Sequence, residues 1–116
     1  MTDLVAATRR DRAPTHPGEM LREDIIPATG KGKAEIARLL GISRQHLYAI
    51  MNEVKPISPD VAVRLGKLFG NGPDLWVRMQ AAFDTWHAAR SVDVSAIPTL
   101  EPANENGAKG YHLARA

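Results

Sequence analysis

Cysteine is absent from the chain of 116 residues. Its absence excludes disulfide scaffolds and thiolate zinc sites, and it is compatible with a reducing cytosol. No apolar run approaches the roughly 18 residues that a membrane span needs. The basic residues Arg9, Arg10 and Arg12 are not followed by the apolar core of a secretory signal. We therefore expect a cytoplasmic protein with no membrane segment.

Signatures of catalysis are missing as well. The four histidines are scattered along the chain, and no His-Glu-x-x-His pair, nucleophile elbow or acidic metal cluster occurs. Residues 30–33 contain two glycines and two lysines, but the upstream glycine of a phosphate-binding loop is missing, and Ala34 replaces its metal-binding Ser or Thr. The sequence thus predicts no enzyme, no cofactor and no metal site.

The basic charge is concentrated in one segment. The formal net charge is only +2, and the length fits a single domain. Residues 18–30 carry one cation against three acids, whereas residues 31–55 carry five cations against two acids. Because clustered cations bind a polyanion such as DNA more strongly than scattered ones, residues 31–55 are the candidate nucleic-acid-binding segment.

This basic segment contains the pattern of two short helices joined by a tight turn, between Lys33 and Asn52. Gly41 falls at the turn, where a positive φ is often needed, and Ser43 can cap the second helix. Apolar residues share one face of each helix: Ile36, Ala37 and Leu40 in the first, then Leu47, Ile50 and Met51 in the second. The two faces must meet, which predicts a helix-turn-helix.

Three further helices are predicted around this pair. One begins at Pro17, where a missing N–H costs nothing, and Pro27 is expected to end it. Another begins after the N-cap Ser58 and ends near Gly70, and the last spans about residues 73–90. The expected fold is therefore all-α, a compact bundle of five short helices.

Domain boundaries follow from the same patterns. Residues 15–90 are predicted to form one DNA-binding and dimerisation domain. Residues 1–14 are polar and are expected to form a flexible arm, either solvated or touching phosphates. Residues 91–116 show no sustained hydrophobic period and are expected to form a largely disordered tail.

The last helix carries a stripe of large apolar residues. Trp76, Met79, Phe83 and Trp86 recur at i, i+3, i+7 and i+10. Trp76 and Met79 are expected in the core. Phe83 and Trp86 lie further along the helix, so burial within the monomer and a dimer contact are both open for them.

These residues are similar to those of a known family. Ala37, Gly41 and Leu47 match the small residue, turn glycine and buried aliphatic of the Xre/Cro type of helix-turn-helix, whose fold is lambda-repressor-like. A wider set of segments strongly resembles the HigA family of antitoxins, namely residues 16–21, 39–44, 57–65, 74–76 and 80–84. The resemblance covers roughly residues 15–87.

The resemblance implies an autorepressor that binds a palindromic operator as a homodimer. It also implies a partner, a HigB-type mRNA endonuclease toxin that the protein neutralises by direct binding. The alternative is a stand-alone Xre-type regulator without a toxin; an interaction module that binds no DNA is disfavoured by the basic segment. The chain departs from the family at Lys33-Ala34, usually a Ser/Thr-Gln pair, and at Glu53-Val54, where Gly usually follows Asn52.

The expected DNA contacts follow from placing the second motif helix in a major groove. Arg44 suits the O6 and N7 atoms of guanine, Gln45 suits the N6 and N7 atoms of adenine, and Tyr48 suits a thymine methyl or a phosphate. Two roles remain open for Ser43, a phosphate contact or a helix cap only. Two also remain open for Lys55, a phosphate contact or a solvated charge. The predicted DNA-binding set is Lys33, Ser43, Arg44, Gln45, Tyr48, Asn52 and Lys55.

Overall fold

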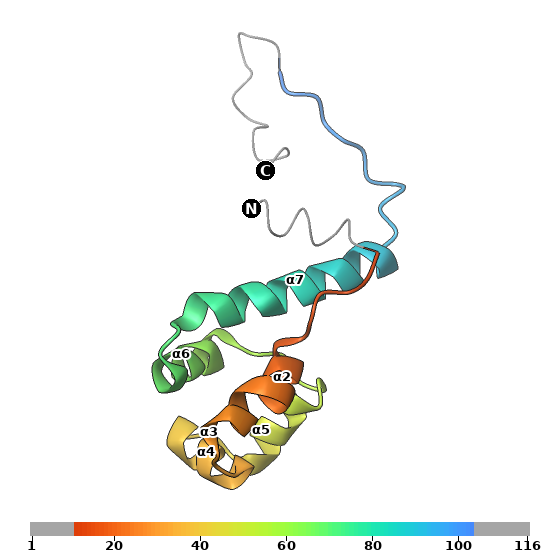
Figure 1. Ribbon diagram of the computed structural model, residues 1–116. Coiled ribbons are helices and arrows are strands. Elements are labelled where there is room, and N and C mark those ends of the chain that lie inside the picture. Colours follow the sequence, from red (N-terminus) through yellow and green to blue (C-terminus); the bar gives the residue numbers. More distant parts are fainter. Residues whose placement is uncertain (1–10, 104–116) are drawn as a thin grey trace.

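The computed structural model describes residues 11–103, and the outer parts of the predicted arm and tail, 1–10 and 104–116, lie outside the described residues. The described part is helical and contains no strand, which confirms the predicted all-α class. Its elements are α2 Pro17–Met20, η1 Leu21–Ile25, α3 Ile26–Thr29, α4 Lys33–Leu40, α5 Arg44–Met51, α6 Pro59–Phe69 and α7 Pro73–Ser91 (Figure 1). Because α2, η1 and α3 follow one another without a break, residues 11–103 fold into five helices.

The first helix corrects one prediction. Pro27 does not end it, because the helix continues to Thr29, and Gly30, with a φ of 71°, ends it instead. The segment before the proline, Leu21–Ile25, is a π-helical turn. A wider π turn relieves the clash between a proline ring and the preceding carbonyl, so the helix passes through Pro27.

The central pair forms as predicted. Gly41 ends α4 with a φ of 75°. The Ser43 hydroxyl caps α5 by accepting a hydrogen bond from the N–H of His46 at 3.0 Å. The six apolar residues expected on the two facing stripes are all buried: Ile36, Ala37, Leu40, Leu47, Ile50 and Met51. The helix-turn-helix is confirmed.

The fourth and fifth predicted helices, α6 and α7, also begin where expected, at Pro59 and Pro73. Ser58 caps α6 by accepting a hydrogen bond from the N–H of Val61 at 3.2 Å, and Gly70 ends it with a φ of 75°. A Cβ at Gly66 would lie 2.2 Å from the backbone of Gly72, so only glycine lets the start of α7 approach α6 this closely.

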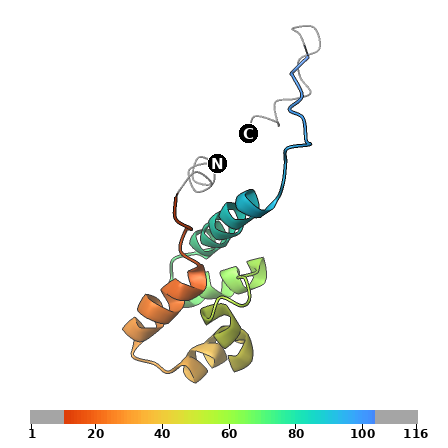
Figure 2. The same ribbon diagram turned by 90° about the vertical axis from the view of Figure 1, so that its right-hand side faces the viewer.

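The hydrophobic core lies where η1, α3, α4, α5, α6 and the first half of α7 meet. Trp76 is fully buried there, as predicted, and its indole N–H donates to the side chain of Asn71 at 3.0 Å. Met79 is only half-buried. The later half of α7 extends beyond the helix-turn-helix in both views (Figures 1 and 2).

Candidate nucleic-acid interface

The outward face of α5 is polar, and its inward face is locked in the core. Leu47 and Ile50 are at most 1% exposed, whereas Arg44, Gln45 and Tyr48 are exposed, Tyr48 by 41%. Because the inward side chains fix the rotation of the helix, the three outward ones project together. This is the arrangement expected of a helix that reads base edges, although their contact with DNA stays a prediction.

Three of the predicted contact residues meet at a shallow hollow beside this face. Lys33, at the start of α4, lies near Tyr48 of α5 and near Asn52, the C-cap of that helix. The hollow of about 190 Å³ is completed by Arg22 and Met51. The first turn of α4 has no side-chain cap, so its free N–H groups carry the partial positive charge of a helix N-terminus. This charge adds to that of the Lys33 ammonium group. A phosphate between the two helices would fit this charge pattern.

The other predicted contacts lie at the edges of the surface. Ser43 is exposed and serves as a cap, which confirms one of its two predicted roles and leaves the phosphate contact a prediction. Lys55 is exposed on the loop after α5 and does not line the hollow. Contact of Lys55 with a DNA phosphate therefore stays a prediction.

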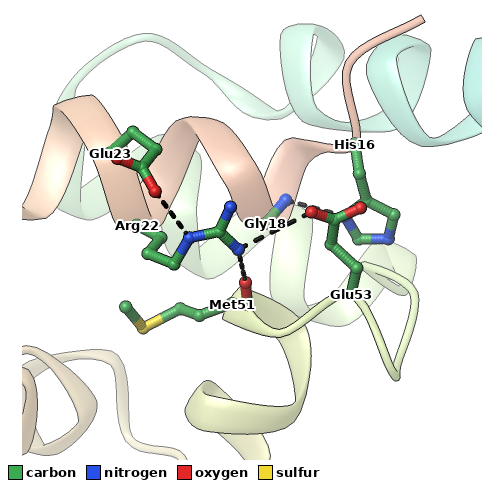
Figure 3. A network of polar contacts seen from close by, with 6 residues as sticks. All are labelled: His16, Gly18, Arg22, Glu23, Met51 and Glu53. Atoms are coloured by element: carbon green, nitrogen blue, oxygen red, sulfur yellow. Dashed lines mark hydrogen bonds and ion pairs between the residues drawn. The ribbon is translucent and has the colours of Figure 1, made fainter. Parts of the chain in front are cut away.

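Arg22 is a part of the site that the sequence did not reveal. Its guanidinium donates a hydrogen bond to the carbonyl of Met51, in the last turn of α5, and another to the Glu23 carboxylate at 2.8 Å. The Glu53 carboxylate lies 3.6 Å from the same guanidinium (Figure 3). A cation thus satisfies a free carbonyl at the C-terminal end of α5, where it also complements the helix dipole.

Glu53 explains the departure from the family at this position. Its φ is 63°, and it is the only described residue besides glycine with a positive φ. The backbone therefore keeps the conformation that glycine adopts at low cost. Here the ion pair with Arg22 offsets part of the strain.

His16 holds the start of the first helix against this same region. It is 3% exposed, and its Nδ1 accepts a hydrogen bond from the N–H of Gly18 at 2.8 Å. Burial lowers the pKa of His16 below its ordinary value of 6.5, although the carboxylates of Glu53, Asp84 and Glu19 act in the opposite direction. The neutral imidazole is therefore the form that caps the helix.

Phe83 and Trp86, the predicted dimer residues, are half-buried within one chain. The Phe83 ring meets the His16 ring edge to face, with centroids 4.7 Å apart. The guanidinium of Arg90 lies 3.7 Å from the Trp86 ring centroid. Each aromatic side chain thus has partners in the monomer and retains exposed surface, and the dimer contact stays a prediction.

Within residues 11–103 no cluster of three or more histidine or carboxylate side chains is arranged to hold a metal ion. No helix in the same range is long and apolar enough to cross a membrane. The chemistry available at the outward face of α5 is hydrogen bonding and charge.

Comparison with known proteins gives consistent matches. A helix-turn-helix family profile matches residues 31–76. The HTH-type transcriptional regulator YbaQ of Escherichia coli K12 is 31% identical over 70% of this chain and 72% of its own. A HigA-family addiction module antidote protein from Coxiella burnetii is 30% identical, covers 78% of this chain and 100% of its own, and superposes with a TM-score of 0.70.

A third match was solved with DNA. It is the Pseudomonas aeruginosa antitoxin HigA, whose structure was determined with the higBA promoter. Its sequence is 30% identical to this chain, the match covers 77% of this chain and 97% of that one, and the TM-score is 0.68. The fold and the matched segment define the chain as a helix-turn-helix protein of the Xre type. Within that class it belongs to the HigA family.

Proposed function

We propose that this protein is the antitoxin of a type II toxin-antitoxin module and a sequence-specific repressor of its own promoter. The observation that carries the proposal is the outward face of α5, where Arg44, Gln45 and Tyr48 project from a helix whose other face is buried. The likeness to an antitoxin solved with its promoter supports the same docking. No step of this function requires bond making, so the proposed role is not enzymatic.

In the proposed complex α5 lies in a major groove. Arg44 contacts the O6 and N7 atoms of guanine, and Gln45 contacts the N6 and N7 atoms of adenine, since both side chains can form two parallel hydrogen bonds. Tyr48 contacts a thymine methyl or a phosphate, and Asn52 extends this face. Lys33, Ser43 and Lys55 bind phosphates and set the register of the protein on the duplex.

A homodimer would place two copies of α5 about 34 Å apart, one turn of DNA, on a palindromic operator. The exposed parts of Phe83 and Trp86 are the proposed contact, because they lie on the half of α7 that extends beyond the helix-turn-helix. This position leaves α5 uncovered. Binding to operator DNA implies a cytoplasmic location.

The proposed partner is a HigB-type mRNA endonuclease toxin, which the antitoxin neutralises by direct binding. Support comes from family membership and from the antidote and antitoxin names of the solved relatives. The second candidate is a stand-alone Xre-type regulator, which is favoured by the likeness to YbaQ. A small toxin-like reading frame beside the gene, whose product forms a complex with this protein, would decide for the antitoxin.

Gel shift and footprinting on the upstream region of the gene test the DNA-binding half. We expect a specific complex that weakens steeply between 50 and 200 mM salt, as phosphate contacts require, and a footprint with two-fold symmetry. Random DNA of equal length is the control. Equal affinity for both duplexes would overturn the proposal of a sequence-specific repressor, and an asymmetric footprint would overturn dimeric docking.

A further inference from the structure

A basic-rimmed apolar groove lies between α4 and α6, on residues that the proposed DNA-binding set does not include. Its volume is about 310 Å³. Leu39 and Val63 line it while 42% and 59% exposed, respectively, and the charged groups in its lining are two cations, Arg64 and Lys67. Arg64 is fixed in place, because it donates to the Leu40 carbonyl at 2.9 Å and to Asp60 at 2.6 Å.

The chain carries a segment of matching chemistry after α7. Residues 92–101 are all exposed. Their side chains include four large aliphatic groups and two carboxylates, and they contain no Lys or Arg. The aliphatic residues are 56–66% exposed: Val92, Val94, Ile97 and Leu100. Such a run of apolar side chains in water, with acidic groups at both ends, matches a groove that has apolar walls and a basic rim.

We propose that residues 92–101 of one copy dock in the groove between α4 and α6 of a second copy. The charges favour this occupant, because Asp93 and Glu101 are the only charged residues of the segment, and the charged groups in the groove lining are Lys67 and Arg64, of which Arg64 also pairs with Asp60. Pro98 disfavours a helix in this segment, and the turn in which the N–H of Ile97 donates to the carbonyl of Val94 at 2.9 Å opens when the segment binds as an extended strip. This inference goes beyond operator recognition and does not require it.

The length of α7 favours a groove on another molecule for the first part of the segment. The 19 residues of α7 measure about 28 Å. The helix begins next to the end of α6 and carries the segment away from it (Figure 1). Ile97 is six residues beyond the helix and reaches at most about 20 Å back. Val94 and Ile97 therefore fall short of the groove of their own chain.

The absence of native cysteine allows a direct test by disulfide trapping in the full chain. A Val63→Cys chain is mixed with a Ser95→Cys chain that carries a size tag, and the mixture is oxidised mildly. Val77→Cys on α7, an exposed valine outside the groove, is the matched control. We expect at least ten-fold more covalent heterodimer with Val63→Cys than with Val77→Cys. Leu39→Cys offers a second groove position should Val63→Cys fail to fold.

Charge exchange adds a second requirement. Lys67→Glu in the groove chain should lower the heterodimer yield several-fold, and Asp93→Lys with Glu101→Lys in the tail chain should restore it. Yields equal to the Val77→Cys control would overturn the proposal. A single chain that carries both Val63→Cys and Ser95→Cys gives a further check. The proposal would be overturned if this chain formed its disulfide within one molecule, at a rate that does not change when the protein is diluted. Gel shift of the same variants reports separately on the proposed DNA binding.

Discussion

Arg22 of η1 donates a hydrogen bond to the backbone carbonyl of Met51 in the last turn of α5 (Figure 3). The same guanidinium pairs with Glu53, which follows the C-cap of α5 and has a positive φ. One side chain from the first helix thus connects the end of α5 to the rest of the bundle.

Arg22→Ala should therefore lower stability more than the loss of an ordinary surface ion pair. The Met51 carbonyl would lose its charged donor, and Glu53 would lose its partner. Urea denaturation measures the effect, with Arg38→Ala as the control, because Arg38 pairs only with the exposed Glu35 on its own helix among the contacts of the described residues. Equal midpoints for the two variants would show that Arg22 has no special structural role.

Gly18→Ala should be strongly destabilising. A Cβ at Gly18 would lie 1.8 Å from the Ile50 carbonyl oxygen, so α5 would have to move away from α2. Overpacking of this kind costs about 3 kcal/mol when backbone has to shift. Gly32→Ala is the control, because no atom lies within 4 Å of its Cβ, and it should change stability by less than about 1 kcal/mol. Thermal or urea unfolding that showed similar values for both would refute the close approach.

Stability should fall as the pH is lowered from 7 toward 5.5, in part through His16. Burial lowers its pKa in the folded state, so just below pH 6.5 the unfolded chain takes up a proton that the folded chain does not. The contribution is fully present above pH 6.5 and is lost progressively below it, down to the folded-state pKa. His16→Asn keeps a capping oxygen without titrating in this range. Urea unfolding of both proteins should show that the free energy of unfolding depends less on pH in the variant. Identical pH dependence in the two proteins would show that His16 is not its source.

Glu53→Gly should raise stability or leave it unchanged. Glycine removes the strain of a positive φ, worth about 1 kcal/mol, at the cost of the half-exposed ion pair with Arg22. Glu53→Val should destabilise by about 1–2 kcal/mol, since a β-branched residue resists this φ. Denaturation midpoints check both changes, and a Val variant as stable as the Gly variant would disprove the strained conformation.

Much of the fold could be predicted from local patterns. Gly41 and Ser58 act through their own backbone or the next few residues, so their roles are visible in the sequence. The apolar spacing of α4 and α5 fixed which faces meet. Pro27 was misjudged because its tolerance depends on a π turn before it, and no side-chain pattern marked that turn.

The long-range polar contacts could not be predicted. Arg22 and Met51 are 29 residues apart in sequence, and the side chain of Gln80 accepts a hydrogen bond from the N–H of Ile57, 23 residues away, at 2.8 Å. Such pairs form only after packing brings the helices together. The outward direction of Arg44, by contrast, followed from the buried stripe on the other side of its helix.

The central claim is that the outward face of α5 reads sequence, and a pair of binding titrations tests it. Arg44→Ala and Lys55→Ala are each titrated against the upstream region and against random DNA of equal length, at two salt concentrations. We predict that Arg44→Ala lowers the binding free energy by about 1–3 kcal/mol on the operator only. Lys55→Ala should weaken binding to both duplexes alike and reduce the slope of log K against log salt concentration by about one. Equal losses on operator and random DNA for Arg44→Ala would contradict the account.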